Sequence, residues 1–336
     1  MRALVWHGPR SMRLERVPDP VPGPGEVLLR VEAVGICGSE LSGYLGENSL
    51  RRPPLVMGHE FVASVAALGP GAGAAVGARV VVNPLLPCGA CPACRRGQRH
   101  LCAERRIVGA ARPGAFADAV AVPASACHEV AGDLPAPVAA LAEPLACAVR
   151  AVGHARPEPG SRVLILGAGA IGLLAVAVAL RAQPSLLAVA DVHAARLGTA
   201  GLWGASHLID GAGPVAEDAR RLAGGEGVDI AVDAVGVAAT RRAAVRAVRP
   251  GGRVVFVGLH DAESPLPCNE IVRGEVEVRG SFCYSEADFE AALAMLARGT
   301  LRQGPWIEER PLEEGPQAFD DLLRGAVGAS KVILRP

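Results

Sequence analysis

The pattern of apolar and polar residues changes near residue 161. Before that point, the apolar positions come in short, partly alternating runs that are typical of β-strands. Such runs cover 26–34, 61–65 and 79–82, and the prolines and glycines of 22–25 introduce the first of them. Residues 84–113 have little apolar periodicity and predict an irregular lobe. The first part of the chain is therefore expected to be mostly β.

After residue 161, short apolar runs alternate with stretches of helical periodicity. This rhythm predicts βαβ units and a doubly wound parallel sheet, so the fold class is α/β. The expected boundary between the two regions lies near 147–160, and a further helix at 286–298 and a strand at 331–334 end the chain. The expected strands of the second region are 162–166, 186–190, 206–209, 228–232 and 253–257, and its expected helices are 171–182, 194–203, 214–223 and 238–248.

One apolar stretch, 163–180, carries no charge and reaches the length of roughly 18 residues that a membrane-spanning helix needs. It contains Gly167, Gly169 and Gly172, which follow a run of β-type residues. A strand, a tight glycine turn and a buried helix explain this stretch better than a span does. The apolar run at the N-terminus is too short for a signal sequence, so we expect a cytoplasmic protein.

Composition narrows the possible partners. The 336 residues predict two domains, and an apolar content of 50% is enough for a sizeable core. The 34 basic and 34 acidic residues balance, which argues against a nucleic-acid or anionic-membrane partner. Lys331 is the only lysine, so arginine carries almost all the positive charge, a bias that we attribute to codon usage and not to chemistry. Nine cysteines cannot all pair, so metal-bound thiolates in a reducing compartment are the better interpretation.

Four of these cysteines form a closely spaced motif in the irregular lobe. Four thiolates at such spacing suit a tetrahedral zinc ion with no open position, whose role is to hold the lobe together. A disulfide framework would need an oxidising compartment, and a ferredoxin-type cluster would place a Cys-Pro pair after the last gap, which is absent. The motif consists of Cys88, Cys91, Cys94 and Cys102.

A second, dispersed set of residues suggests an open metal site. Cys37 follows the strand at 26–34, His59 lies in a Gly-His-Glu turn, and Glu143 begins a Glu-Pro-Leu segment. One thiolate, one imidazole and one carboxylate leave a fourth position for water or substrate. Each residue also has an ordinary interpretation, because a lone cysteine is usually a small buried hydrophobe and a His-Glu pair usually lies on a surface or caps a helix.

A glycine turn follows the strand at 162–166 and opens a helix. The first glycine permits the turn, the second lets a pyrophosphate approach the backbone, and the third lets helix and strand pack closely. An acid at the end of the next strand can accept hydrogen bonds from ribose hydroxyls and repel a 2′-phosphate, which favours NAD over NADP. A glycine-rich packing turn without ligand is the alternative. The candidate cofactor residues are Gly167, Gly169, Gly172 and Asp191, with Gly236 and Gly258 at two later strand ends.

In this order along the chain, the motifs resemble the zinc-dependent medium-chain dehydrogenase/reductase family, in particular its sorbitol-like polyol and threonine dehydrogenase branch. The resemblance implies a GroES-like, mostly-β catalytic domain (1–150 and 283–336) with a structural zinc lobe, and a Rossmann NAD-binding domain (151–282). It also implies two zinc ions per chain and a homodimer or homotetramer that pairs through an edge strand at 276–279.

The resemblance further assigns the residues of the catalytic site. It makes Cys37 and His59 ligands of the catalytic zinc, together with Glu60 and Glu143, one of which binds through water or in alternation. It makes Ser39 the hydroxyl that passes the substrate proton outward. Three positions depart from the family pattern: Glu40 replaces an aspartate, Ser42 replaces a frequent histidine of the proton relay, and Arg150 lies where a histidine is common.

The expected function is hydride transfer between NAD and a secondary alcohol, such as a polyol, a sugar-derived alcohol or an amino alcohol, in a cleft between the domains. An NADPH-preferring ketone or aldehyde reductase and a non-enzymatic nucleotide-binding protein are the alternatives. Substrate clues are few. Tyr44 lies just beyond the catalytic turn and either lines the substrate pocket or packs on the lobe. Arg51 and Arg52 are interpreted as a solvated surface pair in preference to a site for a carboxylate or phosphate.

Overall fold

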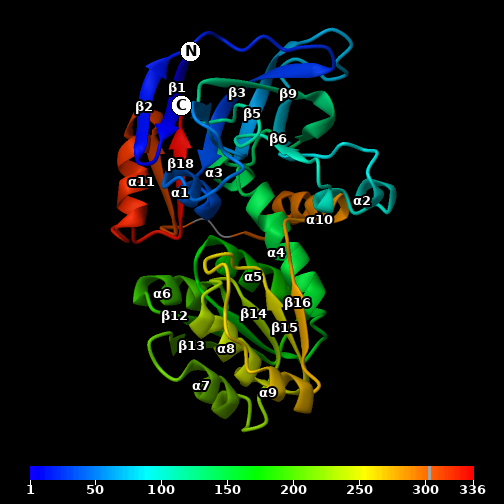
Figure 1. Ribbon diagram of the computed structural model, residues 1–336, viewed down its shortest axis with the longest axis vertical. Coiled ribbons are helices and arrows are strands. Elements are labelled where there is room, and N and C mark those ends of the chain that lie inside the picture. The colour runs from blue at the N-terminus through cyan, green and yellow to red at the C-terminus, as the bar shows by residue number, and fades with distance from the viewer. Residues whose placement is uncertain (302–303) are drawn as a thin grey trace. The chain divides into compact units, whose positions relative to one another are not determined.

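The computed structural model describes residues 1–301 and 304–336, and these form two compact units (Figure 1). The first unit combines Met1–Glu143 with Ala292–Pro336, and the second is Pro144–Ala291. The divisions fall inside helix α4 (Ala142–Ala155) and inside helix α10 (Glu286–Ala297). The sequence-based boundaries at 150 and 283 lie within α4 and just before α10. Among the described residues, no helix is long and apolar enough to cross a membrane.

The first unit is built around strand β3 (Glu26–Gly35), which pairs antiparallel with three strands. These partners are β5, β9 and β18, and the sheet runs in the order β10-β6-β5-β3-β18-β17 with β9 paired beside it on β3. A second sheet has the order β2-β1-β4. The strands are β1 (Arg2–Gly8), β2 (Ser11–Arg16), β4 (Leu55–Val56), β5 (Glu60–Leu68), β6 (Arg79–Val82), β7 (Leu85–Leu86), β8 (Arg106–Ile107), β9 (Ala119–Pro123), β10 (Cys127–Glu129), β17 (Ile307–Pro311) and β18 (Lys331–Arg335).

Buried apolar side chains from both segments of the chain share one core in the first unit. Phe319 of helix α11 (Gly315–Leu323) lies with its ring centroid 5.8 Å from that of Phe116 and 5.2 Å from that of Tyr44. The C-terminal segment therefore completes this core. The other helices of the unit are α1 (Gly38–Tyr44), α2 (Pro92–Arg95) and α3 (Ala136–Ala139), with 3₁₀ turns at Arg99–Leu101, Ala124–Ala126 and Leu312–Glu314.

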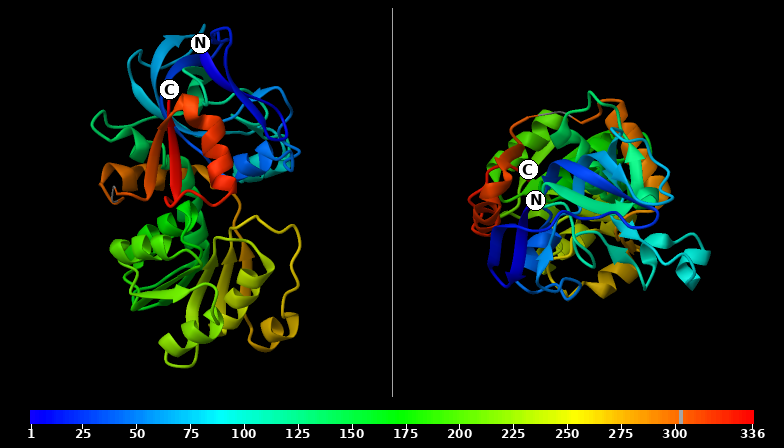
Figure 2. Two further views of the ribbon diagram at one scale, coloured as in Figure 1. Left: turned by 90° about the vertical axis from the view of Figure 1, so that its left-hand side faces the viewer. Right: turned by 90° about the horizontal axis from the view of Figure 1, so that it is seen from above.

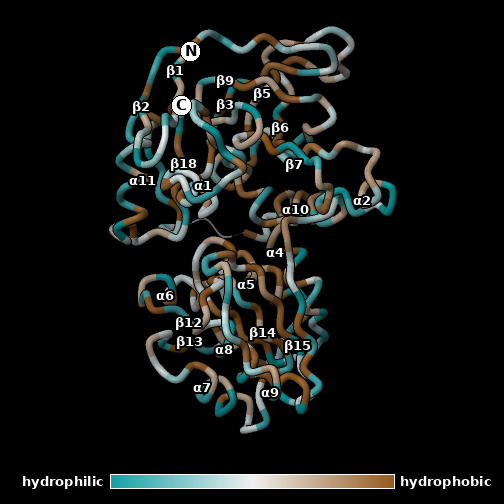
Figure 3. Tube along the Cα trace, in the orientation of Figure 1, coloured by the Kyte–Doolittle hydropathy of each residue, from teal (hydrophilic) through white to brown (hydrophobic). Residues whose placement is uncertain are grey.

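The second unit is a parallel six-stranded sheet in the order β13-β12-β11-β14-β15-β16. Helices cover both of its sides (Figure 2), so the predicted doubly wound sheet is confirmed. Strand β14 and the last three residues of β15 (254–256) are mostly apolar, whereas helix α7 at the margin carries polar positions (Figure 3). The elements are β11 (Arg162–Leu166), α5 (Ala170–Ala179), β12 (Leu186–Asp191), α6 (Ala194–Trp203), β13 (His207–Asp210), α7 (Val215–Leu222), β14 (Val228–Asp233), α8 (Ala238–Ala247), β15 (Val248–Phe256), α9 (Cys268–Arg273) and β16 (Glu277–Gly280).

The uncharged stretch 163–180 is a strand, a glycine turn and a buried helix, as predicted. Helix α5 ends at Ala179, earlier than expected, because a 3₁₀ turn (Leu180–Ala182) and a left-handed Gln183 follow it. The strand order reverses between β11 and β14. In a doubly wound sheet, ligands bind beside the carboxyl ends of the strands at this reversal. The glycine turn after β11 therefore lies at the position where a nucleotide is expected.

Candidate metal centres and nucleotide site

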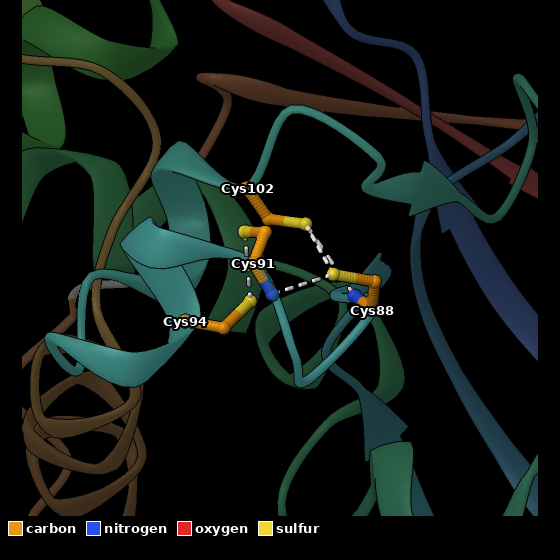
Figure 4. Close-up of side chains that lie close together, drawn as sticks. All are labelled: Cys88, Cys91, Cys94 and Cys102. Carbon is orange, nitrogen blue, oxygen red and sulfur yellow. Dashed lines mark hydrogen bonds between the residues drawn. The ribbon is translucent and has the colours of Figure 1, made fainter.

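The four-cysteine lobe brings its thiols together without disulfide bonds (Figure 4). Its four sulfur atoms lie within 4.8 Å of one another, and the Sγ atoms are 3.6 Å apart for Cys91 and Cys94 and 3.5 Å apart for Cys88 and Cys102. Zinc–sulfur bonds of about 2.3 Å in a tetrahedron place neighbouring sulfurs about 3.8 Å apart, so the cradle fits a zinc ion.

The backbone of this lobe prepares the thiols for a cation. Cys91 is the N-cap of helix α2, and a hydrogen bond from the Cys94 N–H lowers the pKa of Cys91 to about 6. Burial instead raises the pKa of Cys94 to about 11. Without metal, Cys91 therefore loses its proton more readily than Cys94. A zinc ion would hold all four thiols as thiolates.

A second set of donors lies where β3 ends and β5 begins. The antiparallel register opposes Gly35 to Glu60, which brings the start of β5 close to Cys37, the N-cap of α1. One ligand atom each of Cys37, His59 and Glu60 lies within 4.8 Å of the others. His59 and Glu60 are buried and Cys37 is partly exposed, so solvent reaches this set at Cys37. This donor set fits a zinc ion that keeps a position for water or substrate.

Glu40 fixes the orientation of His59. Its Oε1 accepts hydrogen bonds of 2.8 Å from His59 Nδ1 and from the Gly58 N–H, and its Oε2 accepts one of 3.1 Å from the Cys37 N–H. Holding Nδ1 in this way leaves Nε2 for a metal, which is the usual task of a carboxylate behind a histidine ligand. The longer side chain of Glu40 thus reaches the histidine directly, a role that sequence analysis did not assign.

Burial and neighbouring charges shift the pKa values of His59 and Glu40 in opposite directions. Burial alone would lower the pKa of His59, but the Glu40 carboxylate and the Cys37 sulfur outweigh it and raise this pKa well above its ordinary value. Burial would raise the pKa of Glu40, but His59 and Arg51 outweigh it and lower this pKa. The metal-free pair is therefore an ion pair, and a cation that binds His59 displaces its proton.

Lys331 is a buried neighbour of the donor set of Cys37, His59 and Glu60. Its ammonium forms an ion pair with Glu60 Oε2 and donates a hydrogen bond of 3.0 Å to the carbonyl of Ile36. Burial would lower the pKa of Lys331, but Glu60 and Cys37 outweigh it and raise this pKa. Sequence analysis assigned no role to this lysine. One sequence signal could have drawn attention to Lys331: it is the only lysine in a chain whose other 33 Lys or Arg positions are all arginine.

The remaining predicted ligand, Glu143, stays outside this group. It lies in the first turn of α4 and is buried, but it is not a member of the set formed by Cys37, His59 and Glu60. Its role as a ligand stays a prediction.

The Ser39 hydroxyl stands next to the donor set. Its Oγ donates to Cys37 Sγ over 3.4 Å and accepts from Arg51 Nη2 over 3.4 Å. Arg51 is only 6% exposed, so its interpretation as a solvated side chain was wrong, whereas Arg52 is exposed as expected. Ser42 donates to the backbone carbonyl of Ser39. Its hydroxyl is therefore engaged by the helix itself.

Tyr44 belongs to the framework and not to a pocket wall. It ends helix α1, is 3% exposed, and packs against Phe319. Its hydroxyl donates a hydrogen bond of 3.2 Å to Asp320 Oδ1. The Tyr44 side chain thus ties helix α1 to helix α11.

The second unit contains a cavity of about 680 Å³ at the carboxyl end of the sheet. Gly167, Gly169 and Asp191 line it, together with Arg196 and Arg242. Asp191 is held at the strand end, because its Oδ2 accepts from the Ala168 N–H over 2.7 Å and its Oδ1 from the His193 N–H over 2.8 Å. This turn, with a fixed carboxylate at its edge, has the arrangement expected of a nucleotide-binding turn.

The other three candidate glycines serve close packing. A Cβ on Gly172 would collide with the carbonyl oxygen of Gly167, so helix α5 can meet the turn only through glycine. Gly236 and Gly258 face each other so closely that a Cβ on either would collide with the backbone of the other. None of the three lines the cavity among the described residues. They shape the strand ends that border it.

Comparison with known proteins places the whole chain in one family. The model of the alcohol dehydrogenase GroES-like domain matches residues 23–132, and that of the zinc-binding dehydrogenase matches 170–298. Sorbitol dehydrogenase of Bacillus subtilis is 32% identical, covering 100% of this chain and 97% of the relative. Erythritol/L-threitol dehydrogenase of Mycolicibacterium smegmatis is 36% identical, covering 100% and 98%.

Solved structures agree with these relatives. A zinc-binding dehydrogenase from Sinorhizobium meliloti, whose structure contains NADP, superposes with a TM-score of 0.94 at 32% identity, covering 100% of this chain and 99% of that one. Galactitol-1-phosphate dehydrogenase from Escherichia coli superposes with a TM-score of 0.92 at 28% identity, covering 100% of both chains. With its GroES-like unit, its parallel nucleotide-binding sheet and its two sets of metal donors, the chain belongs to the zinc-type medium-chain alcohol dehydrogenase family.

Proposed function

We propose that the protein oxidises a secondary alcohol of the polyol, sugar-derived or amino-alcohol class and transfers the hydride to NAD. The observation that carries this proposal is the Ser39 hydroxyl beside the open donor set of Cys37, His59 and Glu60. The relatives named for sorbitol, erythritol and galactitol 1-phosphate point to polyols as the substrate class.

In the proposed mechanism, Cys37, His59 and Glu60 would hold a zinc ion, and Glu143 would complete this set or alternate with Glu60. Bound zinc supplies Lewis acidity, which lowers the pKa of an alcohol at the open position. Ser39 receives the hydroxyl proton and passes it outward as a relay, because its own hydroxyl is not a strong base. Glu40 keeps His59 in the tautomer that binds metal through Nε2. Lys331 holds Glu60, the acidic member of the donor set, in place.

The preference for NAD is part of this proposal and depends on Asp191. Its fixed carboxylate accepts hydrogen bonds from ribose hydroxyls and repels a 2′-phosphate. A second candidate, an NADPH-preferring ketone or aldehyde reductase, is favoured by a specific observation: Arg196 and Arg242 line the same cavity. Steady-state kinetics with NAD and NADP decides between them. A kcat/KM that favours NADP would refute the NAD assignment.

The enzymatic assignment is tested by NAD reduction across a panel of polyols, sugars, amino alcohols and simple alcohols, with zinc supplied. The matched variant is Cys37→Ser, with Cys127→Ser as the control, because Cys127 belongs to neither donor set. We expect Cys37→Ser to lose turnover and one of two zinc ions per chain. Full turnover with both zinc ions retained would refute the site. Wild-type protein with a single zinc ion in the cysteine lobe would instead favour a non-enzymatic nucleotide-binding protein.

We also propose a cytoplasmic homodimer or homotetramer. Strand β16 is at the edge of the parallel sheet and all four of its residues are exposed. An open strand edge can pair with the same edge of a second copy across a two-fold axis. Light scattering measures the mass in solution, and Val278→Pro should shift it toward the monomer because proline removes a ladder donor. A monomeric wild-type protein would refute this proposal.

A further inference from the structure

Arg51 is a buried arginine beside the proposed proton relay. It lies in the segment that connects α1 to β4, and only 6% of it is exposed. Its stem crosses helix α1 at Gly43, where a Cβ would stand 2.6 Å from Arg51 Cδ and 3.2 Å from Nε. The glycine therefore makes the space through which the guanidinium reaches Ser39.

The guanidinium has little to hold it there. Within the described part of the chain, its single hydrogen bond is the 3.4 Å contact from Nη2 to Ser39 Oγ, which is long for such a bond. Its Nε is buried and, within 1–301 and 304–336, has no acceptor. No carboxylate of these described segments comes within 4.0 Å of it. Other arginines of this unit with larger exposure, Arg79 and Arg310, each form an ion pair.

The buried carboxylate of Glu40 does not satisfy the charge of Arg51. Glu40 acts on Arg51 through space, but its two oxygens already accept from His59, Gly58 and Cys37. A buried charge without a partner is unfavourable unless a ligand completes it. Arginine presents several N–H donors in a planar fork that matches carboxylate and phosphate oxygens. The geometry therefore leaves an anion-binding group next to the reacting hydroxyl.

We propose that Arg51 binds the carboxylate or phosphate of an anionic alcohol substrate. This inference rests on the proposed function and names its substrate class. Arg51 touches Ser39 and Ser39 touches Cys37, so the anionic group must be only a few bonds from the oxidised hydroxyl. Short hydroxy acids and polyol phosphates satisfy this condition. A proton-relay role does not fit, because an arginine side chain in proteins is a donor only and stays charged.

The test compares substrates that differ in the anionic group alone. The substrates are a four-carbon polyol, the corresponding aldonate and the corresponding polyol phosphate, each assayed with NAD and zinc-loaded enzyme. The measured quantity is the kcat/KM of each anionic substrate divided by that of the neutral polyol. Arg51→Met should lower this ratio by about 10- to 100-fold, mainly through KM, because a hydrogen-bonded charge is lost. Arg51→Lys keeps the charge without the planar fork, so its ratio should lie between those of the wild type and Arg51→Met.

Arg52→Met is the matched control, since the neighbouring side chain is exposed and its removal should leave the ratio unchanged. The carboxylate and phosphate arms show which anion the site takes. An unchanged ratio in Arg51→Met would overturn the proposal. So would an equal fall for all substrates accompanied by loss of zinc, which would make Arg51 a support for Glu40. A rise confined to the KM of NAD would assign Arg51 to the cofactor and overturn it as well.

A readout without turnover separates this proposal from the proposed function. Calorimetric titration of the wild-type holoenzyme with oxalate and with inorganic phosphate should show binding of at least one anion, and Arg51→Met should weaken it by about 10-fold or more. If no alcohol is oxidised but this binding depends on Arg51, the proposed function fails and the anion site stands. If polyols are oxidised and neither anion binds, the anion site fails and the proposed function stands.

Discussion

Replacement of Lys331 by methionine tests how the fold holds its acidic donor. The variant keeps an apolar stem of similar length and removes the ammonium that pairs with Glu60 and donates to the Ile36 carbonyl. Both side chains are almost fully enclosed, with 3% and 2% exposure. The substitution therefore leaves a carboxylate buried without its counter-ion, and not a surface charge that water can solvate.

The magnitude follows from that burial. Breaking a buried ion pair by removing one partner costs about 3–5 kcal/mol. For a unit of this size, such a loss corresponds to a fall of roughly 6–20 °C in Tm. Lys331→Arg keeps the charge and should recover part of the loss. The double variant Lys331→Met with Glu60→Gln removes both charges, so its cost should be well below the sum of the two single variants.

The assay is urea unfolding followed by tryptophan fluorescence. Trp6 and Trp306 report on the first unit, and Trp203 of the second unit is removed by Trp203→Phe in all variants. Trp306 is a close reporter, because its carbonyl accepts the backbone N–H of Lys331. Metal-free and zinc-loaded proteins are measured in parallel. A loss below about 1 kcal/mol in the metal-free protein, or additivity of the two single variants, would refute the reasoning.

Three further perturbations probe the other sites. Glu40→Ala should weaken zinc binding at His59 by about 10- to 100-fold, measured by chelator competition, because Nδ1 loses its acceptor; unchanged affinity would contradict this. Gly172→Ala should abolish NAD binding in calorimetry, since the added Cβ collides with Gly167, while the cysteine lobe keeps its zinc. In zinc-stripped protein, the rate of Cys91 alkylation should rise with pH around a midpoint of about 6, as the reactive thiolate forms. Peptide mapping identifies the alkylated cysteine, and a midpoint for Cys91 near the ordinary thiol pKa would exclude a lowered pKa.

The alternation of strands and helices in the second unit could be predicted because it is a local signal. The predicted bounds of strand β11 and of helix α6 agree with the structure at both ends. Strand β17 and helix α11 were missed. Helix α11 begins at Gly315-Pro316, a pair that suggests a turn, although proline is well tolerated in the first turn of a helix. Its helical state is secured by packing of Phe319 in a core built mostly by distant residues.

The metal donors were predicted from motifs, whereas the residues behind them were not. Lys331 meets Glu60 across 271 positions of sequence, and no local pattern marks such a contact. The burial of Arg51 depends on the missing side chain at Gly43, which creates space but no periodic signal. Glu40 was noted as a longer acid than the family norm, but only the folded turn shows that its carboxylate reaches His59. Side chains that act through a second residue are thus the part that sequence patterns miss.

Lys331 and Arg51 are buried cations near the donor set of Cys37, His59 and Glu60. They differ in how many partners satisfy their charge, and this difference separates the roles that we propose for them. Lys331 has a carboxylate and a carbonyl as partners, so its charge is already balanced within the protein. Arg51 has one long contact to a hydroxyl and a buried Nε without an acceptor among the described residues. Removing a balanced charge should mainly cost stability, whereas removing an unbalanced one should mainly change which ligand is bound. Lys331→Met and Arg51→Met therefore form a pair, and the same effect in both would contradict the separate roles assigned to them.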